Sequence, residues 1–290
     1  MSSGALTCKL LKKLVVFRWD MSLRFPGALF LRNLVARRSL LFQLVRRDFE
    51  QRFVGSAVGW IWGVIHPLVL LASWTFVFSI CLHQKMPAGE VTDSYPLFLF
   101  AGMLPWLLFS ETVQRSASSL LDQANLITKT VFPAEMVPVS IFLSSLVSHL
   151  IALALAVAAV GIWLNHISPG LMLLPVYMLL LGMFAVGLGW MLASLQVYLR
   201  DTAQVLTVIL TFWFWLTPIF ITERQFPARL RFLLAGNPLA YLVRAYRELL
   251  LSGRWPGLDE LGIMAVFAMA TFLAGGLFFR HMKRGFADVL

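Results

Sequence analysis

Charged residues are scarce in this chain of 290 residues, and cysteine is scarcer still. Asp, Glu, Lys and Arg together make up 13% of the residues, whereas hydrophobic residues make up 59% and the mean hydropathy is +0.80. These values lie far from those of soluble domains. The apolar runs are continuous and do not alternate at every second residue, which argues against a β-barrel. The composition therefore predicts an all-α polytopic membrane protein.

Several signatures of catalysis are also absent. The chain has no G-x-x-x-x-G-K-S/T phosphate loop, so we expect no ATP hydrolysis by this chain itself. It has no G-x-S-x-G elbow and no paired carboxylates inside an apolar run. The five histidines are scattered without an H-x-x-x-H pair, so no metal site is expected. We therefore predict that the chain is not an enzyme and holds no cofactor.

The cysteines and the charge balance narrow the options further. Cys8 and Cys81 fall on opposite sides of the first predicted span, so we expect no disulfide between them. The net charge of +10 comes mostly from Lys and Arg that flank apolar runs, where they set membrane topology. We therefore expect no nucleic-acid partner. Residues 1–37 lack an apolar segment with a small-residue cleavage site, and we expect a basic cytoplasmic arm there.

Six apolar segments have the length of about 20 residues that crosses the hydrocarbon of a bilayer. They lie near residues 60–82, 96–116, 138–163, 171–196, 203–221 and 259–280. Eleven Lys or Arg against three acids precede the first span. The positive-inside rule then places both termini in the cytoplasm. Glu111 lies near the inner end of the second span, where an ion pair with Arg115 at i,i+4 is the favoured interpretation.

Two segments beside the spans are amphipathic. Residues 38–56 alternate charges with aromatic residues and predict an interface helix on the inner membrane surface, followed by a transmembrane domain over 57–290. Residues 222–258 carry six arginines against two acids and are interrupted by Pro and Gly. We expect a re-entrant helix-break-helix there, which dips into the outer leaflet without crossing. Arg244 and Glu248 within it are spaced to pair with each other.

Four short motifs resemble a known family. They are RRDFEQRFVGSAVGWIWGVIHP at 46–67, NLITKTVFPAEMVPV at 125–139, VYLRDTAQVL with FWFWLTPIF over 197–220, and NPLAYLVRAYRELLLSG at 237–253. In this order and spacing they resemble the permease subunit of polysaccharide-exporting ABC transporters, the Wzm-like O-antigen and capsule exporters of the type-2 exporter class. The likeness covers roughly residues 40–290. Val58 stands where the family more often has Leu.

The resemblance implies a function and partners. It implies a homodimer that forms a channel, with two separate ATPase chains that bind ATP and Mg beneath it. The implied cargo is a polysaccharide on an undecaprenyl diphosphate carrier, exported across the bacterial inner membrane. The missing phosphate loop agrees with a separate ATPase. O-antigen, capsule and teichoic-acid exporters share these motifs, so the glycan stays open.

Residues near the inner surface are candidates for coupling to the ATPase. The alternative interpretation is a plain surface anchor and ordinary connecting loops. The candidates are Arg46, Arg47, Asp48, Glu50, Arg52, Lys129, Phe132, Pro133, Glu135, Arg200 and Asp201.

Aromatic, basic and proline residues supply three further hypotheses. Flat rings can stack on sugars, although Trp also gathers at bilayer interfaces and Phe faces lipid. Arginines can pair with the lipid diphosphate, or only attract anionic lipids. Prolines in spans can bend a gate or be static. The sugar-contact candidates are Trp74, Phe78, Phe212 and Trp215, the diphosphate candidates Arg37, Arg38, Arg46 and Arg47, and the kinks Pro67 and Pro218.

Two other classes remain as alternatives. An ATP-independent flippase or secondary transporter requires coupling-ion acids at mid-membrane, and the sequence offers no strong candidate. An intramembrane enzyme of lipid-linked sugar metabolism requires clustered Asp, His or Arg in the inner loops, and the loop at 197–202 is short.

Overall fold

The computed structural model describes residues 37–52, 54–56, 58–87, 90–129, 132–164 and 168–289. The chain divides into two units, Met1–Arg38 and Ser39–Leu290, and the packing described below is that of the second unit. The basic arm expected over 1–37 falls outside the described residues, apart from Arg37. Every regular element in the described residues is a helix and none is a strand, which confirms the all-α fold class.

Five helical segments among the described residues are long and apolar enough to cross a membrane. Each overlaps a predicted span, so the chain is a multi-pass membrane protein by length and composition. The segments are α4 (Trp62–Trp74) continued by the π-helix η2 (Thr75–Cys81), α5 (Tyr95–Asp122), α7 (Met136–Leu164), η3 (Pro169–Leu173) with α8 (Leu174–Tyr198), and α12 (Leu258–Met282) with η7 (Lys283–Gly285).

The span expected at 203–221 is shorter in the structure. Helix α9 (Thr202–Leu216) has 15 residues, below the 20 or so that a span requires. It ends because Thr217 adopts an extended conformation with ψ 133°, the region that a residue before proline prefers. Pro218 therefore follows the end of a helix, and the kink expected there is wrong, whereas Pro67 does lie inside α4. The count of six spans stays a prediction.

Short helices complete the chain. A helix lies within the predicted interface segment 38–56, and it is α3, which ends at Gln51. The bounds of the short helices are α3 (Arg38–Gln51), η1 (Gly59–Ile61), α6 (Ala124–Lys129), η4 (Glu223–Gln225), η5 (Ala228–Leu230), α10 (Arg231–Ala235), α11 (Pro238–Arg247), the π-helix η6 (Glu248–Ser252) and α13 (Phe286–Val289).

The segment α11–η6 lies inside the region predicted to be re-entrant. Asn237 caps its start by accepting a hydrogen bond from the Leu239 amide, and Pro238 occupies the first helical position. Gly253 ends it in the left-handed conformation with φ +67°, which glycine adopts without strain. Fifteen residues at about 1.5 Å each give roughly 22 Å, less than the 30 Å hydrocarbon core. The segment is thus too short to cross, and its depth in the membrane stays a prediction.

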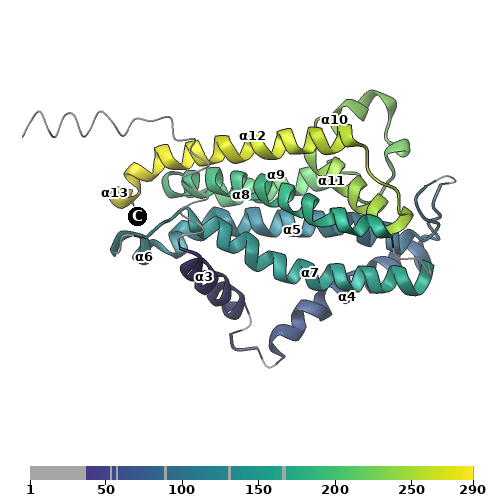
Figure 1. Ribbon diagram of the computed structural model, residues 1–290, viewed down its shortest axis with the longest axis horizontal. Helices are drawn as coiled ribbons and strands as arrows, with labels where there is room; N and C mark the ends of the chain where they lie inside the picture. Colours follow the sequence, from purple (N-terminus) through teal and green to yellow (C-terminus); the bar gives the residue numbers. More distant parts are fainter. Residues whose placement is uncertain are drawn as a thin grey trace, which may run out of the picture. The chain divides into compact units, whose positions relative to one another are not determined.

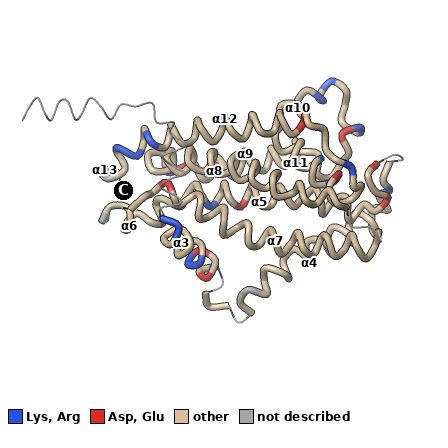
Figure 2. The backbone as a smooth tube through the Cα atoms, viewed as in Figure 1, with Lys and Arg blue, Asp and Glu red and all other residues tan. Residues whose placement is uncertain are grey.

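Helix α5 is the centre of the packing (Figure 1). It contacts α7, α8, α9 and α11, and 83% of its most apolar stretch is buried, against 6% for the first span, Trp62–Cys81. Phe98, Phe100 and Phe109 are among its fully buried side chains. Most charged residues lie toward the two ends of the long helices, and charged positions further inside are seen on α5 (Figure 2). That distribution is the one a hydrocarbon layer imposes.

Helices α8 and α12 approach each other at two glycines. A Cβ atom on Gly275 would collide with the carbonyl oxygen of Gly187, and one on Gly187 would lie 2.5 Å from the Thr271 carbonyl oxygen. Small residues that let two backbones come this close are typical of helix pairs in membranes. Gly262, on the same helix α12, has open space where its Cβ would be.

These two glycines of α12 make a matched pair for substitution. Gly275→Ala forces overpacking against a backbone and is expected to cost roughly 1–3 kcal/mol of stability. Gly262→Ala should leave the thermal midpoint of the detergent-solubilised protein unchanged or raise it, because alanine favours helix. Size-exclusion chromatography after a temperature series measures both midpoints. Equal midpoints for the two variants would mean that the close approach does not matter.

Candidate functional site

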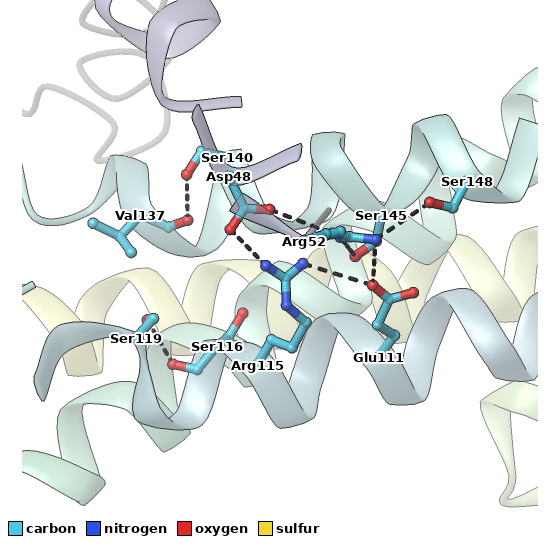
Figure 3. A network of polar contacts seen from close by, with 10 residues as sticks. All are labelled: Asp48, Arg52, Glu111, Arg115, Ser116, Ser119, Val137, Ser140, Ser145 and Ser148. Carbon is cyan, nitrogen blue, oxygen red and sulfur yellow. Dashed lines mark hydrogen bonds and ion pairs between the residues drawn. The ribbon is translucent and has the colours of Figure 1, made fainter. Parts of the chain in front are cut away.

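Four charged residues join α3 to the second span, and we call them the ionic cluster (Figure 3). Asp48 lies on α3, and Arg52 is the first residue after the end of that helix. Glu111 and Arg115 lie on α5. Arg52 Nη1 is 2.7 Å from Glu111 Oε1, and Arg115 Nη2 is 2.5 Å from Asp48 Oδ1. Each ion pair thus crosses from the α3 segment to α5.

Weaker contacts close the ionic cluster into a ring. Arg115 lies 3.6 Å from Glu111, the i,i+4 pair expected from the sequence, and Arg52 lies 3.8 Å from Asp48. Two cations meet two carboxylates, so the formal charges cancel. A cluster of opposite charges tolerates partial burial because each ion replaces lost water with a partner.

Arg52 extends the ionic cluster to α7. It donates hydrogen bonds to Ser145 Oγ at 2.9 Å and to Ser148 Oγ at 3.2 Å (Figure 3). Burial lowers the pKa of Arg52, and the carboxylates of Glu111 and Asp48 counteract that shift. One guanidinium therefore fixes the end of α3 to two long helices.

The ionic cluster divides the predicted coupling residues on α3 into two groups. Asp48 and Arg52 turn toward the chain's own helices, with side chains 19% and 17% exposed. Arg46, Arg47 and Glu50 are exposed, and Arg46 Nε pairs with Glu50 Oε1 at 2.7 Å. Only the second group is free to meet a partner. In the sequence, Asp48 and Arg52 are spaced i,i+4, and so are Glu111 and Arg115. These spacings indicate a pair within each segment but not the contacts between the two segments.

The predicted inner elbow is also tied to the chain itself. Glu135 Oε2 lies 2.6 Å from Lys283 Nζ in η7, and Trp190 Nε1 donates to the Glu135 carbonyl oxygen at 2.9 Å. Phe132 is half-buried and Pro133 is buried.

The remaining coupling candidates are less constrained. Arg200 and Asp201 are exposed between α8 and α9, and Gln196 holds that turn by donating to the Arg200 carbonyl and accepting from the Ala203 amide. The side chain of Lys129 lies outside the described part of the chain.

A second charged group lies at the other end of the helices. Arg244 of α11 donates to Glu223 Oε2 at 2.6 Å and also pairs with Glu260 at the start of α12. The expected pairing of Arg244 with Glu248 is therefore wrong. Glu223 and Glu260 are distant from Arg244 in sequence, but tertiary packing brings their carboxylates closer to its guanidinium than that of Glu248, the i,i+4 neighbour.

Arg247 is the most deeply buried cation of the described residues, at 6% exposure. Its guanidinium donates to the carbonyl oxygens of Phe98 at 3.2 Å, Pro218 at 2.7 Å and Ile219 at 2.5 Å. It also lies over the Phe98 ring, 3.4 Å from the centroid. Burial lowers the pKa of Arg247 to about 9, so the group stays charged at neutral pH. No sequence pattern indicated this role.

The predicted sugar-contact aromatics have different surroundings. Phe212 and Trp215 are 71% and 66% exposed on α9. Phe78 packs against Phe220 with ring centroids 5.3 Å apart, and Trp215 stacks on the same Phe220 at 5.5 Å. Trp74 is half-buried. Phe220, absent from the prediction, thus joins two of the four candidates.

The four diphosphate candidates, Arg37, Arg38, Arg46 and Arg47, are all exposed. Among the residues that the structure describes, no group of three or more His, Cys, Asp or Glu could hold a metal ion.

Breaking the ionic cluster should release α3. Glu111→Gln leaves Arg52 without its nearest carboxylate, and a hydrogen bond to a charged group contributes roughly 1.5–3 kcal/mol. We expect a lower thermal midpoint and faster tryptic cleavage after Arg52. Glu50→Gln is the matched control, because its ion pair is exposed and such pairs add little. Cleavage at the same rate in both variants would show that the ionic cluster does not hold α3.

Comparisons with known proteins agree with this architecture. Residues 39–251 match the membrane family described as "ABC-2 type transporter". Similar relatives include the "O-antigen export system permease protein RfbA" of Myxococcus xanthus, 29% identical over 89% of this chain and 97% of the relative. A Klebsiella pneumoniae protein of the same name is 24% identical over 87% of this chain and 95% of the relative. The "Polysialic acid transport protein KpsM" of Escherichia coli is 25% identical over 82% of this chain and 91% of the relative. The chain belongs to the ABC-2 type transporter membrane family.

Proposed function

We propose that this chain is the transmembrane subunit of an ATP-driven exporter that moves a lipid-linked polysaccharide, an O-antigen or a similar glycan, across the bacterial inner membrane. The observation that carries the proposal is the match of nearly the whole chain to permeases of O-antigen and polysialic acid export. Both termini face the cytoplasm, and two copies form the channel above two ATPase chains that bind ATP and Mg. This chain forms the path of the glycan through the membrane, and the ATPase chains hydrolyse ATP.

The coupling surface is formed by the exposed residues of the inner end. Arg46, Arg47 and Glu50 on α3 would contact the ATPase, together with the exposed turn at Arg200 and Asp201. The ionic cluster supports this assignment, because it transfers any displacement of α3 to α5 and α7 through fixed ion pairs. Asp48 and Arg52 then act as positioning residues rather than as contacts to the partner.

The cargo would meet two further sets of residues. The exposed arginines Arg37, Arg38, Arg46 and Arg47 would attract the diphosphate of the carrier lipid at the inner surface. The rings of Phe212 and Trp215 on α9, together with those of Trp74 and Phe78, suit a sliding polymer, because stacking on sugar faces requires no sequence-specific contacts. The domain division into an arm at 1–37, an interface helix at 38–56 and a transmembrane domain at 57–290 belongs to the same proposal.

Co-purification from the native membrane tests the proposal directly. We expect the tagged chain, extracted in mild detergent, to bring a P-loop ATPase in a two-plus-two complex that hydrolyses ATP. A Walker-motif Lys→Ala variant of the co-purified ATPase is the control and should abolish hydrolysis. A chain that comes out alone and inactive in several detergents would favour an ATP-independent flippase.

Charge reversal at Arg47 tests the coupling surface. Arg47→Glu changes an exposed side chain, so we expect normal expression and folding. Export of the glycan should fall severalfold while ATP hydrolysis continues, because the docking contact is repelled. Arg229→Glu, exposed in the segment between α9 and α10, is the control and should export normally. Normal export by Arg47→Glu would remove Arg47 from the coupling surface.

Glu135 requires a different design because it is bonded within the chain. Glu135→Lys breaks the 2.6 Å bridge to Lys283 and is expected to uncouple hydrolysis from export. The exchanged pair Glu135→Lys with Lys283→Glu restores the bridge with the charges reversed. Rescue of export by the exchange assigns Glu135 to the internal bridge, whereas continued uncoupling assigns it to the contact with the ATPase.

A further inference from the structure

A cavity of about 540 Å³ lies beside the ionic cluster, between α4, α5 and α7. Its walls come from the start of the first span at Trp62, from α5 between Leu104 and Gln114, and from α7 between Ser145 and Ala152. The first span is little buried, and Trp62 is 49% exposed, so the cavity is open on the side of the first span, whereas its inner wall includes the buried Leu108 and His149. The permease function proposed above assigns no role to it.

The lining of this cavity changes from polar to apolar along α5. Arg52, Glu111 and Gln114 line it near the ionic cluster, whereas Leu104 and Leu107 line it one to two turns further into the span. His66 and His149 also line the cavity, and the buried His149 ring is already paired with the Tyr246 hydroxyl at 3.1 Å. Along α5, polar groups at the interface end and apolar groups toward the middle match the polarity of a lipid molecule. An apolar groove elsewhere on α7, lined by Leu150 and its neighbours, has no such gradient.

The polar end carries groups that are not fully used by the protein. Both ion pairs of Glu111 involve Oε1, and Figure 3 shows the other carboxylate oxygen pointing away from the two guanidinium groups. Ser145 and Ser148 accept hydrogen bonds from Arg52, which leaves each hydroxyl hydrogen able to donate. The cavity thus offers one anionic acceptor and two hydroxyl donors next to a guanidinium.

The charges of this end select the ligand. Because Arg52 and Arg115 are matched by Glu111 and Asp48, the end has no net positive charge, and a diphosphate or an anionic lipid gains little there. A head group with both signs fits better. A primary ammonium can pair with the free Glu111 oxygen, and a phosphodiester can accept from the serine hydroxyls.

We propose that this cavity binds a zwitterionic phospholipid of the leaflet next to α3, with an ethanolamine-phosphate head group at Glu111, Ser145 and Ser148 and an acyl chain along Leu104 and Leu107. The lipid fills the space between the loosely packed first span and the rest of the chain. This inference does not depend on the proposed export function, because mass spectrometry can detect a lipid bound to the chain in the absence of any ATPase or glycan.

Mass spectrometry of the full chain, delipidated by extended detergent washing, tests the proposal. We expect one phosphatidylethanolamine per chain to remain on the unaltered protein. Leu107→Trp fills the apolar part of the cavity and should lower that occupancy at least fivefold. Leu150→Trp adds the same bulk to the apolar groove on α7 and should leave occupancy unchanged.

A second measurement does not rely on any variant. Protein that a harsher detergent has stripped of all phospholipid should gain a higher thermal midpoint from mixed micelles of phosphatidylethanolamine than from micelles of phosphatidylglycerol. Equal stabilisation by both lipids, equal lipid retention in the two tryptophan variants, or retention of a diphosphate-linked lipid instead would each overturn the proposal. Loss of ATPase co-purification, by contrast, would bear on the export function alone.

Discussion

Every buried carbonyl oxygen in a membrane protein must find a donor inside the protein, because hydrocarbon offers none. Helix α9 stops at Leu216, and the carbonyls of Pro218 and Ile219 that follow are buried without helical partners. Arg247 reaches across from α11 and donates to both. A planar guanidinium is suited to this role because its several N–H groups point to different acceptors at once. The break in α9 is thus compatible with burial only while α11 stays in place.

Neighbouring contacts follow from the same arrangement. Asn237 caps α11 and also accepts from Trp213 and donates to Thr217, so the end of α9 and the start of α11 share one side chain. Gly102 of α5 leaves the space that the Arg247 guanidinium occupies, since a Cβ atom there would lie 2.6 Å from Nη2. The end of the protein around α11 is therefore built around polar groups, and the ionic cluster supplies a second polar attachment of α5.

The sequence predicted what depends on composition along the chain and missed what depends on contacts between distant segments. Five spans followed from apolar length, because hydrocarbon thickness fixes the number of residues required. The span predicted at 203–221 is longer than helix α9, which ends at Leu216. The apolar run continues past Pro218, and hydropathy alone does not show where a helix breaks. The i,i+4 rule gave the Glu111–Arg115 contact but was wrong for Arg244, whose partners lie 21 and 16 residues away. Nothing local indicated that Arg52 would meet Glu111 or that Arg247 would be buried.

The glycine contact between α8 and α12 determines which parts of the protein can move. Backbones that touch at Gly187 and Gly275 cannot slide or separate without losing their whole interface, so these two helices behave as one body, and α5 packs against it through α8. The first span, with 6% of its apolar stretch buried, has no comparable attachment. In a conformational cycle, α4 would therefore move against the rigid body formed by α5, α8 and α12. Its mobility would depend on what occupies the cavity between α4, α5 and α7.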